Sequence, residues 1–572
     1  MSAFETEAWL KSYSEWTPHS LDYGETTLLD VYDNNVAINA AKPGTWFFGR
    51  AQTWGEVDKL VCRAAAGLRA FGVRPGDRVA LAMPNCPQHV VAFWAVLKLG
   101  ATVVEHNPLY TAHELQDPFD NHGARVAIVW DKSAPVFETL RESTSLETIV
   151  SVNMIEAMPK LQQLALKIPL PKLRESRDAL HAPAPNTVPW EALIGTAIGG
   201  DGEDVVSDPS VTTDTIGVIM YTSGTTGKPK GAQLSHGALY SNILQGKYWV
   251  EGLGDEQERM LAALPFFHAY GLTMVLTLSA LIGGEMVIVP SPKLPLILEA
   301  FKKRSPTWMS GVPTLFEKLM DAAEEQGDAE QLKSVRNTFC GAATMPPEIV
   351  AKWEGMTSGL FVEGYGLTET SPILIGTPMN DARKVGYIGV PFPDTEIRIV
   401  DPENPDELMP DGTEGEIQAR GPQIFSGYLN NEEATEEAFH DGWFRTGDVG
   451  VMDEDGFVKL VARIKEVIIT GGFNVYPAEV EEVLRGHSDV ENVAVVGRPR
   501  EDGSEDVVAC VTLREGAAID PEGLKEFARG RLTRYKVPRT FYHFEELPEN
   551  LMGKISRREV RDELVKRISA EG

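Results

Sequence analysis

The chain has 572 residues, of which 43% are hydrophobic and 24% are charged, a balance typical of folded globular proteins and enough for about three or four domain equivalents. These values exclude a collagen-like, coiled-coil or wholly disordered chain. Lys and Arg number 53 against 83 Asp and Glu, so the net charge is −30, which argues against nucleic acid as the main partner because a phosphate backbone is repelled.

The N-terminal residues Met1–Glu7 are acidic and lack an apolar stretch, so they do not resemble a secretory signal. The most apolar run, Leu272–Ile282, is shorter than the ~18–20 residues that a membrane span needs. The 4 cysteines form no Cys-x-x-Cys pair, which favours buried or inert thiols in a reducing compartment. We therefore expect a cytoplasmic protein.

Short apolar strands alternate with helices along the first half of the chain. Helical spacing predicts helices over Thr53–Phe71 and Val90–Leu99. Strands are predicted at Arg78–Met83, Ala101–Val104, Ala127–Trp130, Ile216–Tyr221 and Glu285–Val289. This alternation predicts an α/β fold in which helices cover parallel sheets.

The segment Met154–Pro189 interrupts this pattern, because its prolines prevent a single long helix. Leu161, Leu164 and Ile168 still share one helical face. Basic residues outnumber acidic ones across Lys160–Asp178. Two interpretations stay open: contact with a membrane surface or a lipid substrate, and a surface excursion that packs on the main domain.

A loop rich in glycine and hydroxyl groups, Tyr221–Gly231, follows the predicted strand at Ile216–Tyr221 and precedes a helix-like stretch from Ser235. Glycines allow a tight turn whose N–H groups point at a phosphate. Hydroxyl or positive groups come from Thr222, Ser223, Thr225, Thr226, Lys228 and Lys230, and the turn glycines are Gly224 and Gly227. The loop is not a Walker A motif, in which four residues separate the glycines and Ser or Thr follows the Lys.

Six further motifs follow in chain order. They are Leu264–Gly271 with His268, the small-residue turn Cys340–Pro346, Glu363–Thr370, Trp443–Asp448, Val461–Pro477 and Leu547–Arg558 with Lys554. Together with the Tyr221–Gly231 loop they resemble, in order and spacing, the adenylate-forming superfamily of acyl-CoA synthetases, adenylation domains and firefly luciferase. The resemblance extends from about Thr53 to Arg561.

The resemblance implies roles for individual residues. The nucleotide-binding residues would be Thr222, Ser223, Gly224, Thr225, Thr226, Gly227, Lys230, Gly341, Ala342, Ala343, Tyr365, Asp448 and Arg463. Tyr365 would stack on adenine, while Asp448 and Arg463 would contact the ribose. The catalytic residues would be His268, Thr368, Glu369 and Lys554, and Glu369 with Thr222 would bind Mg²⁺.

The same resemblance implies a domain organisation. Residues 1–462 would form an N-terminal adenylation domain that includes a β-subdomain, and 463–466 would form a hinge at Lys465. Residues 467–572 would form a small, mobile α+β domain that carries Lys554, and Gly471 and Gly472 would let the CoA arm pass. The chain departs from the family pattern in two places, at Ala462 and at Met552.

The implied activity is an ATP-dependent ligase that converts a long-chain fatty acid to acyl-CoA through acyl-AMP, with ATP, Mg²⁺ and CoA as cofactors. The Met154–Pro189 insertion resembles that of bacterial long-chain fatty-acid ligases, although Leu272 stands where some of them carry a gating Trp. A ligase for medium-chain or aryl acids stays open, as does an inactive protein that binds acyl-AMP or lipid. Two further partners stay open as well: a peripheral membrane surface, contacted through Lys160–Asp178, and a second copy of the chain.

Overall fold

The computed structural model describes residues 2–195, 205–222, 228–341, 345–463, 466–470, 473–500, 505–532, 534–549 and 555–571. It comprises two units. The larger unit contains Trp9–Glu396 and Arg420–Phe444, and the smaller unit contains Met1–Ala8, Ile397–Ala419 and Arg445–Gly572. Each unit is described separately below.

The first sheet of the larger unit has seven strands, all parallel except the β8–β9 pair. In spatial order they are β7 (Val188–Pro189), β6 (Thr148–Val152), β5 (Val126–Trp130), β3 (Arg78–Ala82), β4 (Thr102–Glu105), β8 (Ile216–Thr222) and β9 (Lys230–Ser235). The strands predicted near Arg78, Ala101, Ala127 and Ile216 are confirmed. Strand β9 was not predicted, because Lys-Gly-Ala-Gln-Leu-Ser has little intrinsic strand preference and owes its conformation to its neighbours.

The second sheet has nine strands, with a parallel centre and antiparallel edges. Their order is β16 (Val390–Pro391), β15 (Ile373–Gly376), β14 (Leu360–Gly366), β13 (Asn337–Cys340), β12 (Trp308–Gly311), β10 (Arg259–Ala262), β11 (Glu285–Ile288), β1 (Pro43–Phe47) and β2 (Arg50–Thr53). The strand predicted at Glu285–Val289 is confirmed as β11.

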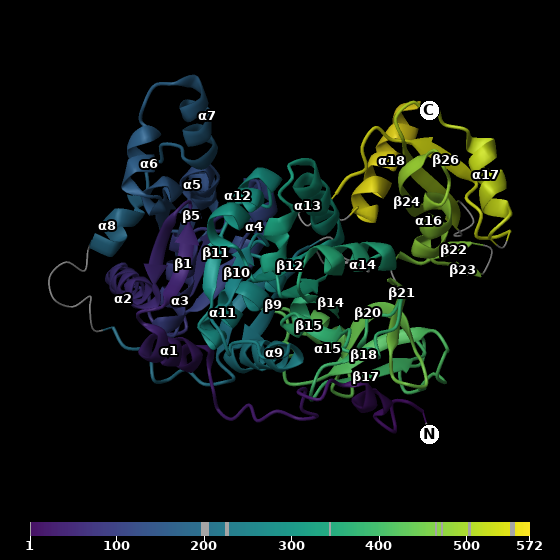
Figure 1. Ribbon diagram of the computed structural model, residues 1–572, viewed down its shortest axis with the longest axis horizontal. Helices are drawn as coiled ribbons and strands as arrows, with labels where there is room; N and C mark the ends of the chain where they lie inside the picture. Colours follow the sequence, from purple (N-terminus) through teal and green to yellow (C-terminus); the bar gives the residue numbers. More distant parts are fainter. Residues whose placement is uncertain are drawn as a thin grey trace. The chain divides into compact units, whose positions relative to one another are not determined.

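Helices flank both sheets (Figure 1). They are α1 (Leu28–Asn39), α2 (Trp54–Ala70), α3 (Pro87–Lys98), α4 (Ala112–His122), α5 (Ala134–Ser143), α8 (Trp190–Gly195), α9 (His236–Trp249), α11 (Leu278–Ile282), α12 (Leu294–Arg304), α13 (Pro313–Glu325), α14 (Pro347–Met356) and α15 (Glu432–Ala438). The two predicted helices are confirmed as α2 and α3. Helix α2 begins at a capping box, in which the Thr53 hydroxyl accepts from the Glu56 amide and the Glu56 carboxylate accepts from the Thr53 amide.

The Met154–Pro189 segment forms two short helices, α6 (Lys160–Ala165) and α7 (Pro171–Leu180), at one end of the larger unit (Figure 1). Gln162 joins the segment to the rest of the unit by donating to the Phe48 carbonyl at 2.9 Å, and Gln163 donates to the Met158 carbonyl at 2.8 Å within the segment. Leu166 is buried, but four other apolar side chains are exposed to solvent. The exposed fractions are 81% for Leu161, 60% for Leu164, 47% for Ile168 and 55% for Leu170.

The smaller unit combines a β-sheet and an α+β segment. The sheet runs in the order β17 (Glu396–Val400), β18 (Gly415–Arg420) and β20 (Trp443–Met452), with β21 (Val458–Arg463) beside β20. The short β19 (Phe439–His440) belongs to the larger unit, where it pairs with Trp443 and Phe444. The α+β segment holds β22 (Ile468–Thr470), β23 (Phe473–Val475), β24 (Val490–Pro499), β25 (Glu505–Leu513), β26 (Thr540–His543), α16 (Pro477–Arg485), α17 (Pro521–Arg529) and α18 (Arg557–Glu571). The mixed α/β architecture and the smaller C-terminal α+β segment agree with the predicted fold class.

The cysteines and the apolar helices can also be compared with the sequence predictions. All of the cysteines, Cys62, Cys86, Cys340 and Cys510, are free and buried, as predicted. None of the helices in the described part of the chain has the length and apolar character needed to span a bilayer.

Candidate active site

The hairpin of β8 and β9 presents two of the predicted nucleotide-binding residues side by side. Its register pairs Thr222 with Lys230, and the Thr222 hydroxyl lies 3.5 Å from the Lys230 carbonyl oxygen. Gly231 leaves little room for a side chain here, because a Cβ atom would lie 3.1 Å from the Tyr221 ring. The predicted residues Ser223, Gly224, Thr225, Thr226 and Gly227 lie outside the described residues.

Glu369 is a buried carboxylate of the larger unit, and the Thr222 hydroxyl of another predicted motif lies beside it. It lies in a short 3₁₀ turn, Thr368–Thr370, directly after β14, and only 7% of it is exposed. Its Oε1 atom lies 3.5 Å from the Thr222 hydroxyl and accepts a hydrogen bond of 2.8 Å from the Tyr428 hydroxyl. Carboxylate and hydroxyl oxygens are the ligands that Mg²⁺ prefers, so the pair predicted as metal ligands fits this ion. Thr368 is half-buried beside it.

The chain around Glu369 is held by backbone contacts that allow few substitutions. A Cβ atom on Gly366 would lie 1.7 Å from the Pro372 carbonyl oxygen, so only glycine fits there. The buried Asn242 side chain donates to the Ile373 carbonyl at 2.8 Å and accepts from the Ile373 amide at 3.0 Å. The 3₁₀ turn is thus fixed on both sides.

His268 ends the segment that follows β10, and its protonation state follows from one hydrogen bond. Its Nδ1 accepts from the Tyr270 backbone amide at 3.2 Å, so the proton of the neutral imidazole is on Nε2. Surrounding protein lowers the pKa of His268 to about 4 through desolvation, although the side chain itself is accessible to solvent. At neutral pH His268 therefore offers an Nε2–H donor.

The small-residue turn after β13 lies against the His268 segment. The Tyr270 hydroxyl donates to the Phe339 carbonyl at 2.6 Å, and a Cβ atom on Gly341 would lie 3.0 Å from the Tyr270 ring. Ala342 and Ala343 lie outside the described residues. Tyr365, the predicted adenine partner, lies half-buried on the neighbouring strand β14.

Asn85 is a residue that the sequence interpretation missed. It is buried between β3 and α3, and its amide donates to the carbonyls of Ala262 at 3.0 Å and Leu264 at 2.7 Å. Its oxygen accepts from the Phe266 amide at 2.8 Å. These contacts join the two sheets and hold the segment that leads to His268. The only local signal is an Asn between a strand and a Pro-initiated helix, which alone indicates nothing about a partner 181 residues away.

The smaller unit holds the predicted ribose contacts. Asp448 is 2% exposed on β20, and the register of β20 and β21 places it opposite Arg463. The side chain of Arg463 lies outside the described residues, as do Lys465, Gly471, Gly472 and Lys554. The predicted roles of these residues stay predictions.

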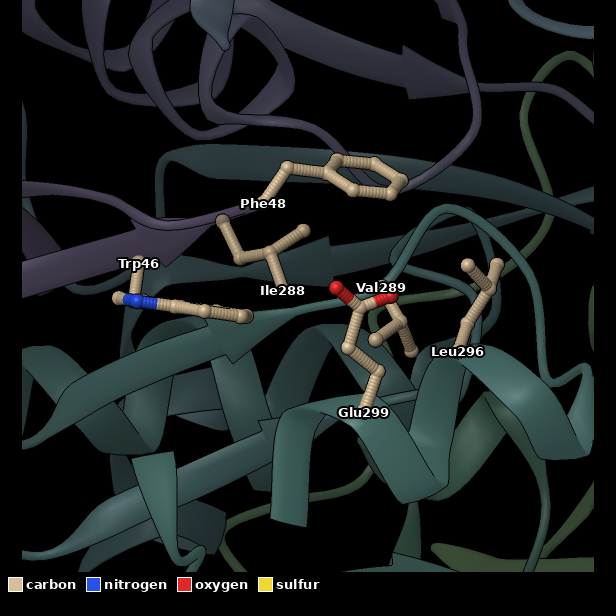
Figure 2. Close-up of a pocket in the computed structure, with 6 residues that line it drawn as sticks. All are labelled: Trp46, Phe48, Ile288, Val289, Leu296 and Glu299. Carbon is tan, nitrogen blue, oxygen red and sulfur yellow. The ribbon is translucent and has the colours of Figure 1, made fainter. Parts of the chain in front are cut away.

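The larger unit also contains an apolar recess lined by Trp46, Phe48, Ile288, Val289, Leu296 and Glu299 (Figure 2). Its volume of about 10 Å³ corresponds to about one water molecule. None of its lining residues was predicted as a site residue, and the recess is too small to hold an acyl chain.

Residues 32–429 match the family described as AMP-binding enzyme, and residues 479–554 match the AMP-binding enzyme C-terminal domain. The chain belongs to the AMP-binding enzyme family. Among its relatives, the long-chain-fatty-acid–CoA ligase of Bacillus subtilis (strain 168) is 34% identical over 556 residues, which cover 97% of this chain and 98% of the relative. The feruloyl-CoA synthase of an Amycolatopsis species is 36% identical over 515 residues, which cover 90% of this chain and 94% of the relative.

A solved structure of the family extends the likeness to three dimensions. The crystal structure of ATP-bound MatB from Rhodopseudomonas palustris has a TM-score of 0.78 and is 26% identical, covering 94% of this chain and 99% of that chain. The sequence-based assignment to the adenylate-forming superfamily is therefore confirmed.

Proposed function

We propose that the protein is an AMP-forming ligase that joins a long-chain fatty acid to CoA. The observation that carries the proposal is that two motifs meet at the Glu369 carboxylate. The Thr222 hydroxyl lies beside Glu369 although the two residues are 147 positions apart, and Thr222 is paired with Lys230 in the hairpin of β8 and β9. The full-length likeness to a bacterial long-chain-fatty-acid–CoA ligase supports the choice of acid.

In the first half-reaction, an oxygen of the fatty-acid carboxylate attacks the α-phosphorus of ATP, and pyrophosphate leaves. Negative charge is held on the phosphoryl oxygens, so catalysis consists mainly of positioning and electrostatic stabilisation. Lys230 and Lys554 supply positive charge, Thr368 supplies a hydroxyl donor, and the Nε2–H of His268 is suited to orient a carboxylate or phosphoryl oxygen. Bound Mg²⁺ would neutralise charge on the phosphates from the oxygens of Glu369 and Thr222.

In the second half-reaction, the CoA thiol attacks the acyl carbonyl and AMP leaves. We infer that the C-terminal segment turns about Lys465 between the two steps, so that Lys554 withdraws and Gly471–Gly472 admits the pantetheine arm. One site then serves both half-reactions in turn.

A ligase for aryl acids is the second candidate, favoured by the likeness to feruloyl-CoA synthase. Pyrophosphate release, measured with ATP, Mg²⁺, CoA and acids of graded chain length, separates the two. Long-chain acids should give the highest rate. A maximum with aromatic or medium-chain acids would support the second candidate, and no release with any acid would indicate an inactive binding protein.

The role of Lys554 can be tested by separating the half-reactions. Lys554→Ala should abolish pyrophosphate release in the first half-reaction but largely spare thioester formation from supplied acyl-AMP, since its ammonium acts on the phosphates. Lys566→Ala, at an exposed lysine of α18, is the matched control and should leave both rates unchanged. Equal loss of both half-reactions in Lys554→Ala would contradict the assignment.

The proposal includes a location and a membrane contact. We place the protein in the cytoplasm, with Lys160–Asp178 touching the inner membrane surface. Support comes from the exposed leucines of Lys160–Leu170, called the α6 region here. It also comes from exposed basic residues, which suit anionic lipid headgroups; they are Lys160, Lys167, Lys172 and Arg174. A homodimer stays open.

A further inference from the structure

Tyr428 lies on a segment that closes over β9 and over Glu369. Backbone hydrogen bonds of 2.8–3.0 Å fix the segment; they join Ser426 to Gln233, Gln233 to Gly427, Leu429 to Gly231 and Phe425 to Glu369. The next side chain, Leu429, is buried against Val104 and Ile219. The position of the Tyr428 ring is therefore set by the sheet rather than by a free loop.

The two ends of the Tyr428 side chain meet two predicted site residues of opposite charge. The hydroxyl donates to Glu369 Oε1 at 2.8 Å, and the Lys230 ammonium lies over the ring, 5.2 Å from its centroid. Burial raises the pKa of Tyr428, and the nearby Glu369 carboxylate raises it further.

This arrangement separates charges that would otherwise attract one another. A lysine and a carboxylate in one partly buried site attract one another, and a direct pair would leave neither group free for a ligand. Tyr428 gives each group another partner: the ring face for the cation and the hydroxyl for one carboxylate oxygen.

We propose that Tyr428 is a positioning residue for the divalent cation and the phosphates. It holds Glu369 by Oε1, which leaves Oε2 available to a metal, and it holds Lys230 over its ring for a phosphate. The proposal rests on the proposed function, because that function supplies the metal–nucleotide ligand. Neither residue type nor spacing marked Tyr428 in the sequence; the contacts alone do.

The test compares Mn²⁺ binding, followed by electron paramagnetic resonance, in the presence of saturating α,β-methylene-ATP, which cannot transfer its adenylyl group to an acid. Tyr428→Phe keeps the ring and loses the hydroxyl. It should weaken Mn²⁺ binding about tenfold, the effect expected for one hydrogen bond to a charged group, and leave nucleotide binding in EDTA within twofold of wild type. Tyr428→Leu also removes the ring and should weaken both.

Tyr32 provides the matched control, because it has the same contacts elsewhere in the larger unit. Its hydroxyl donates to Asp58 at 3.3 Å and its ring lies 5.5 Å from the Lys98 ammonium. Tyr32→Phe should leave Mn²⁺ binding unchanged. A second comparison covers the case in which Tyr428→Phe does not fold. Lys230→Met, which leaves Tyr428 and Glu369 in place, should weaken nucleotide binding in EDTA and keep Mn²⁺ affinity at saturating nucleotide within twofold of wild type, since the ring holds the cation for the phosphate and the hydroxyl holds Glu369 for the metal.

The outcomes are distinguishable. If wild-type protein binds no Mn²⁺–nucleotide, the proposed function fails with the inference. If wild type binds it and Tyr428→Phe binds it equally well, the inference alone is overturned. An equal loss in Tyr32→Phe, or unchanged nucleotide binding in Lys230→Met, would also overturn it.

Discussion

At the scale of single residues, polar side chains in this protein act mainly by fixing backbone segments. Asn85 and Asn242 each satisfy both an N–H and a C=O group of a segment that carries a predicted catalytic residue, His268 or Glu369. A buried amide suits this task, because it offers donors and an acceptor in one plane. Substituting such a residue should therefore affect chemistry as well as stability.

We expect Asn85→Ala to lower kcat for adenylation by roughly tenfold to a hundredfold, since small misplacements of catalytic groups cost that much. KM for ATP should change little, because Asn85 contacts the segment that leads to His268 rather than the hairpin of β8 and β9. Unfolding in urea should show a loss of about 2–4 kcal/mol, as two carbonyls and one amide lose a buried partner.

Asn380→Ala is the control for Asn85→Ala. Asn380 also binds backbone on both sides, donating to the Ser12 carbonyl at 3.0 Å and accepting from the Ala382 amide at 2.8 Å, but it holds the N-terminal segment. It should lose stability with little change in kcat. A normal kcat in folded Asn85→Ala would show that Asn85 has a structural role only.

At the scale of elements, local patterns predicted those helices and strands whose signals lie within their own segment. Helix α2 and strand β8 were predictable because hydrophobic spacing and capping residues are encoded within each segment. Thr222 and Glu369 were found through the motifs that carry them. Strand β9 and the contact of Tyr428 with Glu369 were not predicted, because the partners come from distant parts of the chain; Glu369 and Tyr428 are 59 positions apart.

The α6 region shows the same limit, since periodicity predicted an apolar face but not the direction in which it points. We expect the combined substitution of Leu161, Leu164 and Ile168 by Ser to weaken binding to phosphatidylglycerol vesicles at least tenfold in co-sedimentation. Each exposed side chain would contribute about 1.5–3 kcal/mol if fully inserted. Rates with short soluble acids should not change.

The control for this variant uses Ile38 and Leu109, which are 79% and 68% exposed on other parts of the same unit. Their joint substitution by Ser should leave vesicle binding unchanged. If the α6 variant still binds vesicles as wild type does, the segment is a plain surface feature. High salt should weaken wild-type binding, because the surrounding lysines contribute by charge.

At the scale of the whole molecule, buried histidines couple stability to pH. His106 and His122 lie next to the hairpin of β8 and β9, with their Nε2 atoms 3.1 Å apart. His106 stacks on Tyr221 of β8, with ring centroids 5.7 Å apart. Burial lowers the pKa of His106 to about 3. Burial also lowers the pKa of His122, and the His106 ring and the Arg78 guanidinium lower it further. Both rings are therefore neutral in the folded protein.

The sign of the pH dependence follows. Between pH 6.5, where a histidine of the unfolded chain binds a proton, and pH 3, where folded His106 does so, the unfolded chain binds more protons. The free energy of unfolding should therefore fall as pH decreases, by up to about 1.4 kcal/mol per pH unit for each such histidine. Urea unfolding at pH 7, 6 and 5 measures this slope.

His106→Gln should flatten the slope, even though it lowers stability at pH 7, whereas His113→Gln, at an exposed position, should not. An unchanged slope in His106→Gln would mean that other groups govern the acid sensitivity of the fold.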